Sequence, residues 1–306
     1  MNSKFPIRRG IWLVIIILIV IAYESTVDAP FVYDDKLEVI GNTTIRFIEE
    51  WKAILLYNPS RMLLQLSYAL NFHRSGLEPQ DYHLTNIIIH SCSAGACLFL
   101  TERLASLAKI SKPLLFASTI TIVWTLHPMA TESVTYITGR SESLCALFSL
   151  LTMGFWTKDL ETPHSGWKIL TFITLLCACL SKQVGLMLPF VLLAMEKVFR
   201  NTIRWKVHSP FALLFVAGVV TRIFIVMNEQ EEMNTGAFYV LQNLLPQEVE
   251  RPFFVQIGTQ MEVWLRYCAL WIIPYQQTIY HHIVDAAVPS LKTAGIAAAW
   301  ATTIFL

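Results

Sequence analysis

Long apolar stretches recur along the chain and predict a bundle of membrane helices. A helix needs about 20 apolar residues to cross a hydrocarbon core of roughly 30 Å, so these stretches predict about seven to nine transmembrane helices. With 55% hydrophobic and only 15% charged residues, the chain is too apolar for an ordinary soluble domain. We expect an all-α, multi-pass integral membrane protein. The apolar stretches lie near residues 11–27, 84–100, 114–126, 143–156, 167–180, 184–199, 209–227, 261–274 and 286–306.

The first apolar stretch follows three basic residues and is unbroken from Ile11 to Ala22. A cleaved signal peptide has the same basic start and a similarly short apolar core. We favour a retained helix, because further apolar stretches follow and no clear small-residue cleavage site precedes Phe31.

Lysine and arginine residues predict the orientation of the helices. They gather before the first stretch, after the second stretch and between residues 197 and 208. If the first helix runs outward, strict alternation places all three groups in the cytoplasm, as the positive-inside rule requires. The same alternation places four other segments on the non-cytoplasmic face, namely residues 28–83, 127–142, 181–183 and 228–260.

The segment from 28 to 83 is too long for a simple turn and mixes large apolar residues with polar ones. We expect amphipathic helices lying along the membrane surface, with a break at Asn58-Pro59. We treat residues 1–306 as one membrane module. Because the apolar run that ends at Leu306 has no polar tail, we expect the sequence to be a fragment of a longer protein.

Other composition features narrow the partners. The net charge is +1, and no basic stripe with interleaved aromatic residues is present, so we expect no nucleic-acid partner. The six cysteines all lie inside or beside apolar segments, which predicts buried free thiols and neither a disulfide framework nor a metal site. Near the end of the chain, Glu262 and Arg266 interrupt the apolar pattern, so that segment either carries an ion pair on one helix face or lies at the interface.

Two adjacent acids, Asp34 and Asp35, follow the first helix by only a few residues. Adjacent carboxylates repel each other, so such a pair divides into one general base and one group that orients a ligand or binds a metal. The alternative is a solvated loop pair without a chemical role.

A second polar segment, residues 127–142, lies on the same predicted face. Arg140 suits a phosphate because its planar guanidinium makes two hydrogen bonds at once, and Glu132 or Glu142 would contact a hydroxyl group. The alternative is a helix cap with an ion pair. His127 fits either a structural turn or a catalyst, and Lys182 either reaches the membrane interface or binds phosphate.

These segments together resemble the membrane part of the transmembrane and tetratricopeptide-repeat O-mannosyltransferases and their prokaryotic relatives. The ordered set of motifs covers most of residues 30–200. It consists of Phe31-Val32-Tyr33-Asp34-Asp35, Leu66-Ser67-Tyr68-Ala69-Leu70-Asn71, Gly76-Leu77-Glu78-Pro79, Tyr82-His83-Leu84-Thr85-Asn86, His127-Pro128, Thr131-Glu132-Ser133-Val134 and Tyr136-Ile137-Thr138-Gly139-Arg140-Ser141-Glu142.

The resemblance implies a C-type glycosyltransferase fold that takes a sugar from a polyprenyl-phosphate donor at the external face of the membrane. It places the general base at Asp34 or Asp35. It also implies a substrate-binding set of Arg61, His83, Glu132, Arg140, Glu142 and Lys182.

The chain departs from the family pattern in three places. Met62 replaces a proline that typically follows the arginine at position 61, and Gln183 stands where such sequences commonly have glutamate. No tetratricopeptide repeat is present in the sequence, so acceptor recognition by such repeats is not implied.

The leading hypothesis is an inverting glycosyltransferase that moves mannose or another hexose to a hydroxyl acceptor on a protein or glycan. Its leaving phosphate would be stabilised by Arg140, Lys182 or a divalent cation such as Mg²⁺ or Mn²⁺. A catalytically silent scaffold of the same fold, binding lipid or partner subunits, is the alternative, and a transporter is disfavoured because the stretches carry few deep charges. Bacterial inner membrane and endoplasmic reticulum membrane both fit the topology.

Overall fold

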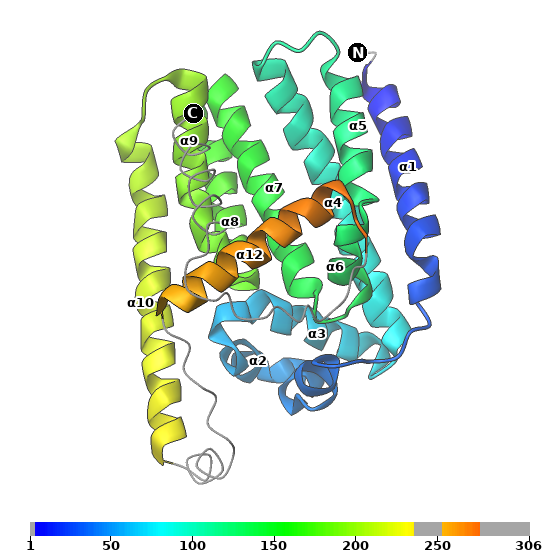
Figure 1. The fold of residues 1–306 in the computed structure, drawn as a ribbon, viewed down its shortest axis with the longest axis vertical. Helices are drawn as coiled ribbons and strands as arrows, with labels where there is room; N and C mark the ends of the chain where they lie inside the picture. The colour runs from blue at the N-terminus through cyan, green and yellow to red at the C-terminus, as the bar shows by residue number, and fades with distance from the viewer. Residues whose placement is uncertain (1–3, 236–252, 276–306) are drawn as a thin grey trace. The chain divides into compact units, whose positions relative to one another are not determined.

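A computed structural model of the chain describes residues 4–235 and 253–275, and every regular element within them is helical (Figure 1). The chain divides into two compact units, Met1–Val226 and Met227–Leu306. The described helices are α1 (Lys4–Tyr23), α2 (Trp51–Tyr57), α3 (Met62–Ser75), α4 (Pro79–Leu107), α5 (Pro113–Thr125), α6 (Thr131–Thr135), α7 (Arg140–Glu161), α8 (Ser165–Ser181), α9 (Leu188–Arg200), α10 (Trp205–Thr235) and α12 (Phe253–Ile272).

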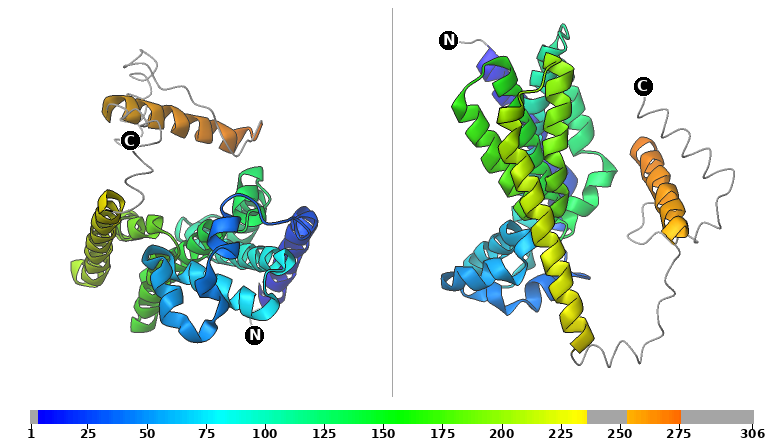
Figure 2. Two further views of the ribbon diagram at one scale, coloured as in Figure 1. Left: turned by 90° about the horizontal axis from the view of Figure 1, so that it is seen from below. Right: turned by 90° about the vertical axis from the view of Figure 1, so that its left-hand side faces the viewer.

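The first unit is a bundle in which the longer helices lie side by side, while α2 and α3 lie across one end (Figures 1 and 2). Helix α7 packs between α4 and α8, and α4 also packs against α5 and α1. Buried apolar side chains form one cluster around Trp156, where α7 to α10 meet, and another around Tyr68 beneath the crossing helices. The bundle therefore holds α7 rigidly, with its first turn next to α3.

Two ion pairs and three connecting segments lie at opposite ends of this bundle. At one end, Arg8 pairs with Glu102 at 2.5 Å and Arg103 pairs with Glu161 at 3.2 Å. The connections that carry Asp34, residues 127–139 and residues 182–187 lie at the other end (Figure 1).

The segment from 28 to 83 contains helices, as expected from its sequence. The predicted break at Asn58-Pro59 is present, because α2 ends at Tyr57 and a 3₁₀ turn, Pro59–Arg61, leads into α3. Proline suits the first residues of such a turn since its missing N–H has no helical partner there.

The expected count of seven to nine spans is not confirmed. By length and composition, Arg8–Thr26 and Pro79–Leu107 can each cross a membrane, and the bent pair Pro113–Thr125 and Pro128–Thr135, at 56°, would make a third span. Two shorter apolar helices are Ser165–Ser181 and Trp205–Thr221. Ser165–Ser181 has 17 residues, and at 1.5 Å per residue that length spans only about 25 Å. The predicted stretch near 286–306 lies outside the described residues.

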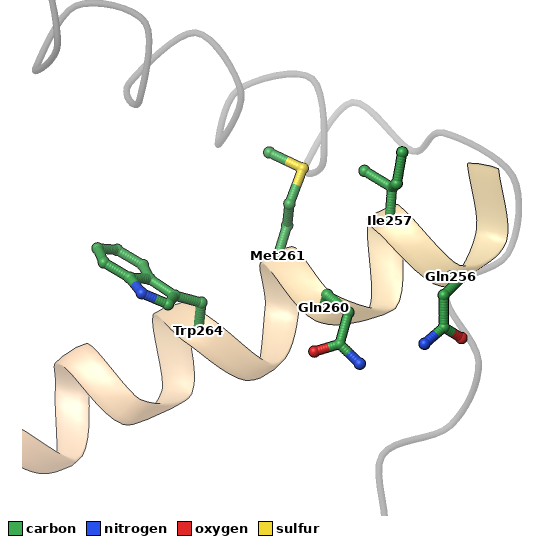
Figure 3. A pocket seen from close by; sticks show the side chains of 5 residues that line it. All are labelled: Gln256, Ile257, Gln260, Met261 and Trp264. Carbon is green, nitrogen blue, oxygen red and sulfur yellow. The ribbon is translucent and has the colours of Figure 1, made fainter. Parts of the chain in front are cut away.

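The six cysteines are free, as expected, but only Cys97 and Cys145 are buried; Cys177, Cys179 and Cys268 are half-buried, and Cys92 is exposed on α4. In the second unit, the segment with Glu262 and Arg266 is one continuous helix, α12. A hollow on this helix is lined by five described side chains, none of which is charged (Figure 3). They are Gln256, Ile257, Gln260, Met261 and Trp264.

Candidate active site

Asp35 is buried and binds the protein itself. Its Oδ1 accepts hydrogen bonds from the backbone nitrogen and the hydroxyl of Thr138, both at 2.9 Å, and its Oδ2 accepts one from the backbone nitrogen of Val32 at 3.1 Å. Only 1% of Asp35 is exposed. This carboxylate therefore ties the loop after α1 to the loop before α7.

Asp34 is exposed, in contrast to its neighbour. Its backbone nitrogen donates to the hydroxyl oxygen of Tyr136 at 2.9 Å. Within residues 4–235 and 253–275, no hydrogen bond or ion pair reaches the Asp34 carboxylate. Burial raises the pKa of Tyr136, so its phenol stays neutral at physiological pH. The structure thus divides the acidic pair into one fixed carboxylate and one that is open to a ligand.

Gly139 allows the loop between α6 and α7 to close tightly. A Cβ atom at this position would lie 2.5 Å from the carbonyl oxygen of Glu132 and 2.9 Å from that of Tyr136. Any other residue would therefore push apart the loop that holds Thr138 and Tyr136 against the acidic pair.

Arg140 is fully buried and its guanidinium donates five hydrogen bonds to neutral groups. The acceptors are Asn86 Oδ1 at 2.6 Å, Asn71 Oδ1 at 2.6 Å, the Ser67 carbonyl at 3.3 Å, the Ser67 hydroxyl at 3.2 Å and the Tyr82 carbonyl at 2.9 Å. The guanidinium also lies 4.9 Å from the centre of the Tyr68 ring. Desolvation lowers the pKa of Arg140 to about 10, so it remains charged at neutral pH.

These contacts make Arg140 a support of the site. Asn86, which receives its Nε–H, donates in turn to the carbonyls of Val134 and Tyr136 at 3.2 and 3.1 Å. Arg140 therefore connects α3 and α4 to the loop that holds Asp34. Its guanidinium faces protein groups, so the geometry favours a positioning role over direct contact with a substrate phosphate.

Glu142 and Lys182 form an ion pair between the first turn of α7 and the end of α8. The Glu142 side chain is 45% exposed and that of Lys182 is 23% exposed. The next residue, Gln183, donates from Nε2 to the hydroxyl of Ser60 at 3.0 Å. Because Ser60 precedes Arg61, the structure brings the two cations Lys182 and Arg61 to one corner.

Arg61 is partly exposed in that corner. Its backbone nitrogen donates to the carbonyl of Asn58 at 2.9 Å. In the described part of the chain, its guanidinium has no hydrogen bond or ion pair. Arg61 and Lys182 are therefore two partly exposed cations in this corner that an anionic ligand could reach.

Three other predicted residues lie apart from this corner. Glu132 is exposed on α6, and its carboxylate has no hydrogen bond or ion pair within the described residues. His83 is buried, with Nε2 donating to the carbonyl of Ala29 at 3.1 Å, so it anchors the loop after α1. His127 accepts a hydrogen bond at Nδ1 from the backbone nitrogen of Met129. This contact is the one expected if His127 forms a structural turn.

The acidic pair does not fit a shared metal ion. Both oxygens of Asp35 accept hydrogen bonds from the protein, which leaves Asp34 alone as an open carboxylate. No group of three or more histidine, cysteine, aspartate or glutamate residues suited to a metal is found within the described ranges.

Sequence reasoning assigned no role to the side chains that hold Arg140 and the acidic pair. These are Ser67, Asn71, Asn86, Tyr136 and Thr138. All five lie inside the motifs that carry the family resemblance. The motifs mark these residues in the sequence, but the motifs alone do not show that the residues contact one another.

Comparison with curated proteins finds related sequences. The chain is 32% identical over 171 residues to protein O-mannosyl-transferase tmtc2 of Xenopus laevis, which covers 51% of this chain and 19% of that protein. It is 30% identical over 185 residues to protein O-mannosyl-transferase TMTC2 of Mus musculus, and the match covers 53% of this chain and 21% of that protein. It is 24% identical over 278 residues to protein O-mannosyl-transferase F38B6.6 of Caenorhabditis elegans, and the match covers 86% of this chain and 38% of that protein.

The chain thus spans about a fifth of the length of the first two relatives. No family model matches the chain. No solved structure matches it either.

Proposed function

Because this chain is a homologue of the TMTC protein O-mannosyl-transferases, we propose that it is the membrane module of a glycosyltransferase. It would move mannose or another hexose from a polyprenyl-phosphate donor to a hydroxyl group, such as that of a protein serine or threonine. The bundle would be a C-type glycosyltransferase fold in the endoplasmic reticulum or bacterial inner membrane. The end that carries Asp34 would face away from the cytoplasm, since basic loops favour the cytoplasmic side.

One observation carries this proposal: Asp34 is an open carboxylate held on a rigid support. Asp35, Thr138 and Tyr136 fix the backbone around it. A general base must be accessible to its substrate and held in a fixed position. Asp34 meets both conditions, and Asp35, with both oxygens occupied, meets only the second.

In the proposed reaction, Asp34 is the general base. The Asp34 carboxylate takes the proton from the acceptor hydroxyl as that oxygen attacks the anomeric carbon of the sugar. The bond between the anomeric carbon and the phosphate oxygen breaks on the opposite face, and its electron pair stays on the lipid phosphate. The sugar is therefore transferred with inversion at the anomeric carbon.

The leaving phosphate needs positive charge nearby, because negative charge accumulates on it in the transition state. We assign this role to Lys182 and Arg61, the accessible cations in the corner beside α3. Glu142 holds Lys182 in the absence of substrate. Arg140 acts through the residues that it orients.

Neutralising Lys182 is expected to weaken donor binding. A hydrogen bond to a charged group contributes about 1.5–3 kcal/mol, so Lys182→Met should raise KM for the donor roughly 10- to 100-fold, while Lys182→Arg should retain most of the affinity. Steady-state kinetics at varied donor concentration measure this effect. Lys168→Met is the matched control, because that lysine pairs with Asp159 at the other end of the bundle. An unchanged KM in Lys182→Met would remove Lys182 from the donor site.

The donor class is tested with membranes that contain the protein. They are incubated with a serine- and threonine-containing peptide and either radiolabelled polyprenyl-phosphate sugars or the corresponding nucleotide sugars. We expect peptide labelling from a lipid-linked hexose when the pathway from nucleotide sugar to lipid-linked sugar is blocked. Labelling from nucleotide sugars alone under that block would contradict the proposal. Absence of labelling from every donor, beside an active related enzyme, would favour the scaffold alternative.

A further inference from the structure

Tyr33, which precedes Asp34, has a backbone conformation that suits glycine or asparagine. Its φ is 43°, in the left-handed region. Among the described residues other than glycine, only Lys109 and Asn201 share a positive φ, and both follow the end of a helix. Bulky residues avoid this region because Cβ comes too close to the following carbonyl oxygen. Such strain persists only where neighbouring structure holds it, and it is found often at functional sites.

The contacts that hold Tyr33 in place come from the acidic pair and its support. The backbone nitrogen of Lys36 donates to the carbonyl of Tyr33 at 3.2 Å. On either side of Tyr33, Val32 is held by Asp35 and Asp34 is held by Tyr136. The same hydrogen bonds that position the base therefore fix the conformation of Tyr33.

The side chain of Tyr33 is not used to fill the core. It is 65% exposed, and its ring meets that of Tyr136 at 83°, with centroids 6.4 Å apart. The two rings thus form an aromatic corner directly beside the open carboxylate of Asp34. A strained backbone that served only the turn would be satisfied better by glycine, so the ring itself is the feature that needs an explanation.

We propose that Tyr33, supported by Tyr136, contacts the ring of the transferred hexose. This inference rests on the function proposed above and adds a residue that determines donor specificity. A hexose carries C–H groups of slight positive charge on its ring face, and an aromatic ring is negative on its face, so the two attract. A serine or threonine acceptor has no ring face to match. The hexose must also lie beside Asp34, since its anomeric carbon is the atom that the deprotonated hydroxyl attacks.

Substitutions at Tyr33 distinguish the effect of the ring from the effect of the backbone conformation. Tyr33→Asn and Tyr33→Gly remove the ring and place residues that tolerate a positive φ, whereas Tyr33→Phe keeps the ring and removes the hydroxyl. In the full-length protein, we expect Tyr33→Asn and Tyr33→Gly to raise KM for the lipid-linked hexose about tenfold. We also expect both variants to discriminate less between different hexoses. Thermal stability should be unchanged or higher in both. Tyr33→Phe should behave like the wild type.

The control is Trp205→Asn. Trp205 is 68% exposed where α10 begins, and the preceding residue, Arg204, pairs with Asp159 in the last turn of α7, so this ring lies far from the acidic pair. We expect no change in KM from this control. A wild-type KM and hexose preference in Tyr33→Asn would show that the ring only anchors the loop at the membrane interface, and would overturn the inference. An equal loss in Tyr33→Phe would also overturn it, because the hydroxyl would then carry the effect. Absence of transfer by the wild type would instead refute the proposed function itself.

Discussion

Asp34→Asn is expected to reduce sugar transfer by about two to four orders of magnitude, the usual contribution of a positioned acid or base. The amide cannot accept the proton of the acceptor hydroxyl at neutral pH. Because the Asp34 carboxylate is exposed and has no hydrogen bond or ion pair within the described residues, the fold should tolerate the change. Initial rates at saturating donor and acceptor, together with the thermal unfolding midpoint in detergent, measure both expectations.

Asp35→Asn is the matched comparison and should affect stability first. Asparagine at this position can accept the two hydrogen bonds from Thr138, but its amide nitrogen would then face the N–H of Val32. Loss of hydrogen bonds to a charged acceptor costs about 1.5–3 kcal/mol. We expect a lower unfolding midpoint in Asp35→Asn and an unchanged one in Asp34→Asn. Full activity in Asp34→Asn would contradict its assignment as the base.

Arg140→Met is expected to destabilise the protein by about 3 kcal/mol and to reduce activity with it. The methionine leaves the amide oxygens of Asn71 and Asn86 buried without the donor they have now. Each unsatisfied buried acceptor costs about 1–3 kcal/mol. The variant no longer buries a guanidinium charge, and this gain offsets part of the cost of the two acceptors. Thermal unfolding of the full-length protein in detergent measures the loss.

Two further variants make this prediction specific to Arg140. Arg140→Lys should also destabilise, because one ammonium group cannot reach acceptors on both α3 and α4 as the guanidinium does. Arg74→Met is the control: Arg74 pairs with Asp81, but its side chain is 58% exposed, so its loss should change stability by less than about 1 kcal/mol. Equal stability of Arg140→Met and wild type would refute the supporting role of Arg140.

The acidic pair shows what could be predicted from the sequence and what required the fold. Its place after the first helix is visible in the sequence, and the repulsion between adjacent carboxylates predicts that the two acids differ. The sequence left open whether Asp34 or Asp35 is the base, because their exposure depends on Thr138, which is 103 residues away from Asp35. Only the fold shows that this contact buries one acid and leaves the other open.

Arg140 shows a different limit. Its chemistry suits phosphate, and this was the reason for expecting it in the substrate site. The residues that occupy its guanidinium come from α3 and α4, and no local pattern links them to α7. The count of spans is not confirmed for a related reason: apolar stretches show which segments avoid water, but not whether each forms a helix long enough to span. Helices α5 and α9 have only 13 residues each.

The most direct test is the transfer of labelled mannose from polyprenyl-phosphate mannose to a serine and threonine peptide by the purified full-length protein, beside its Asp34→Asn variant. The account predicts that the wild type forms a product with the opposite anomeric configuration to the donor and that the variant forms almost none. Equal product from both proteins, or a product with retained configuration, would contradict direct attack assisted by Asp34.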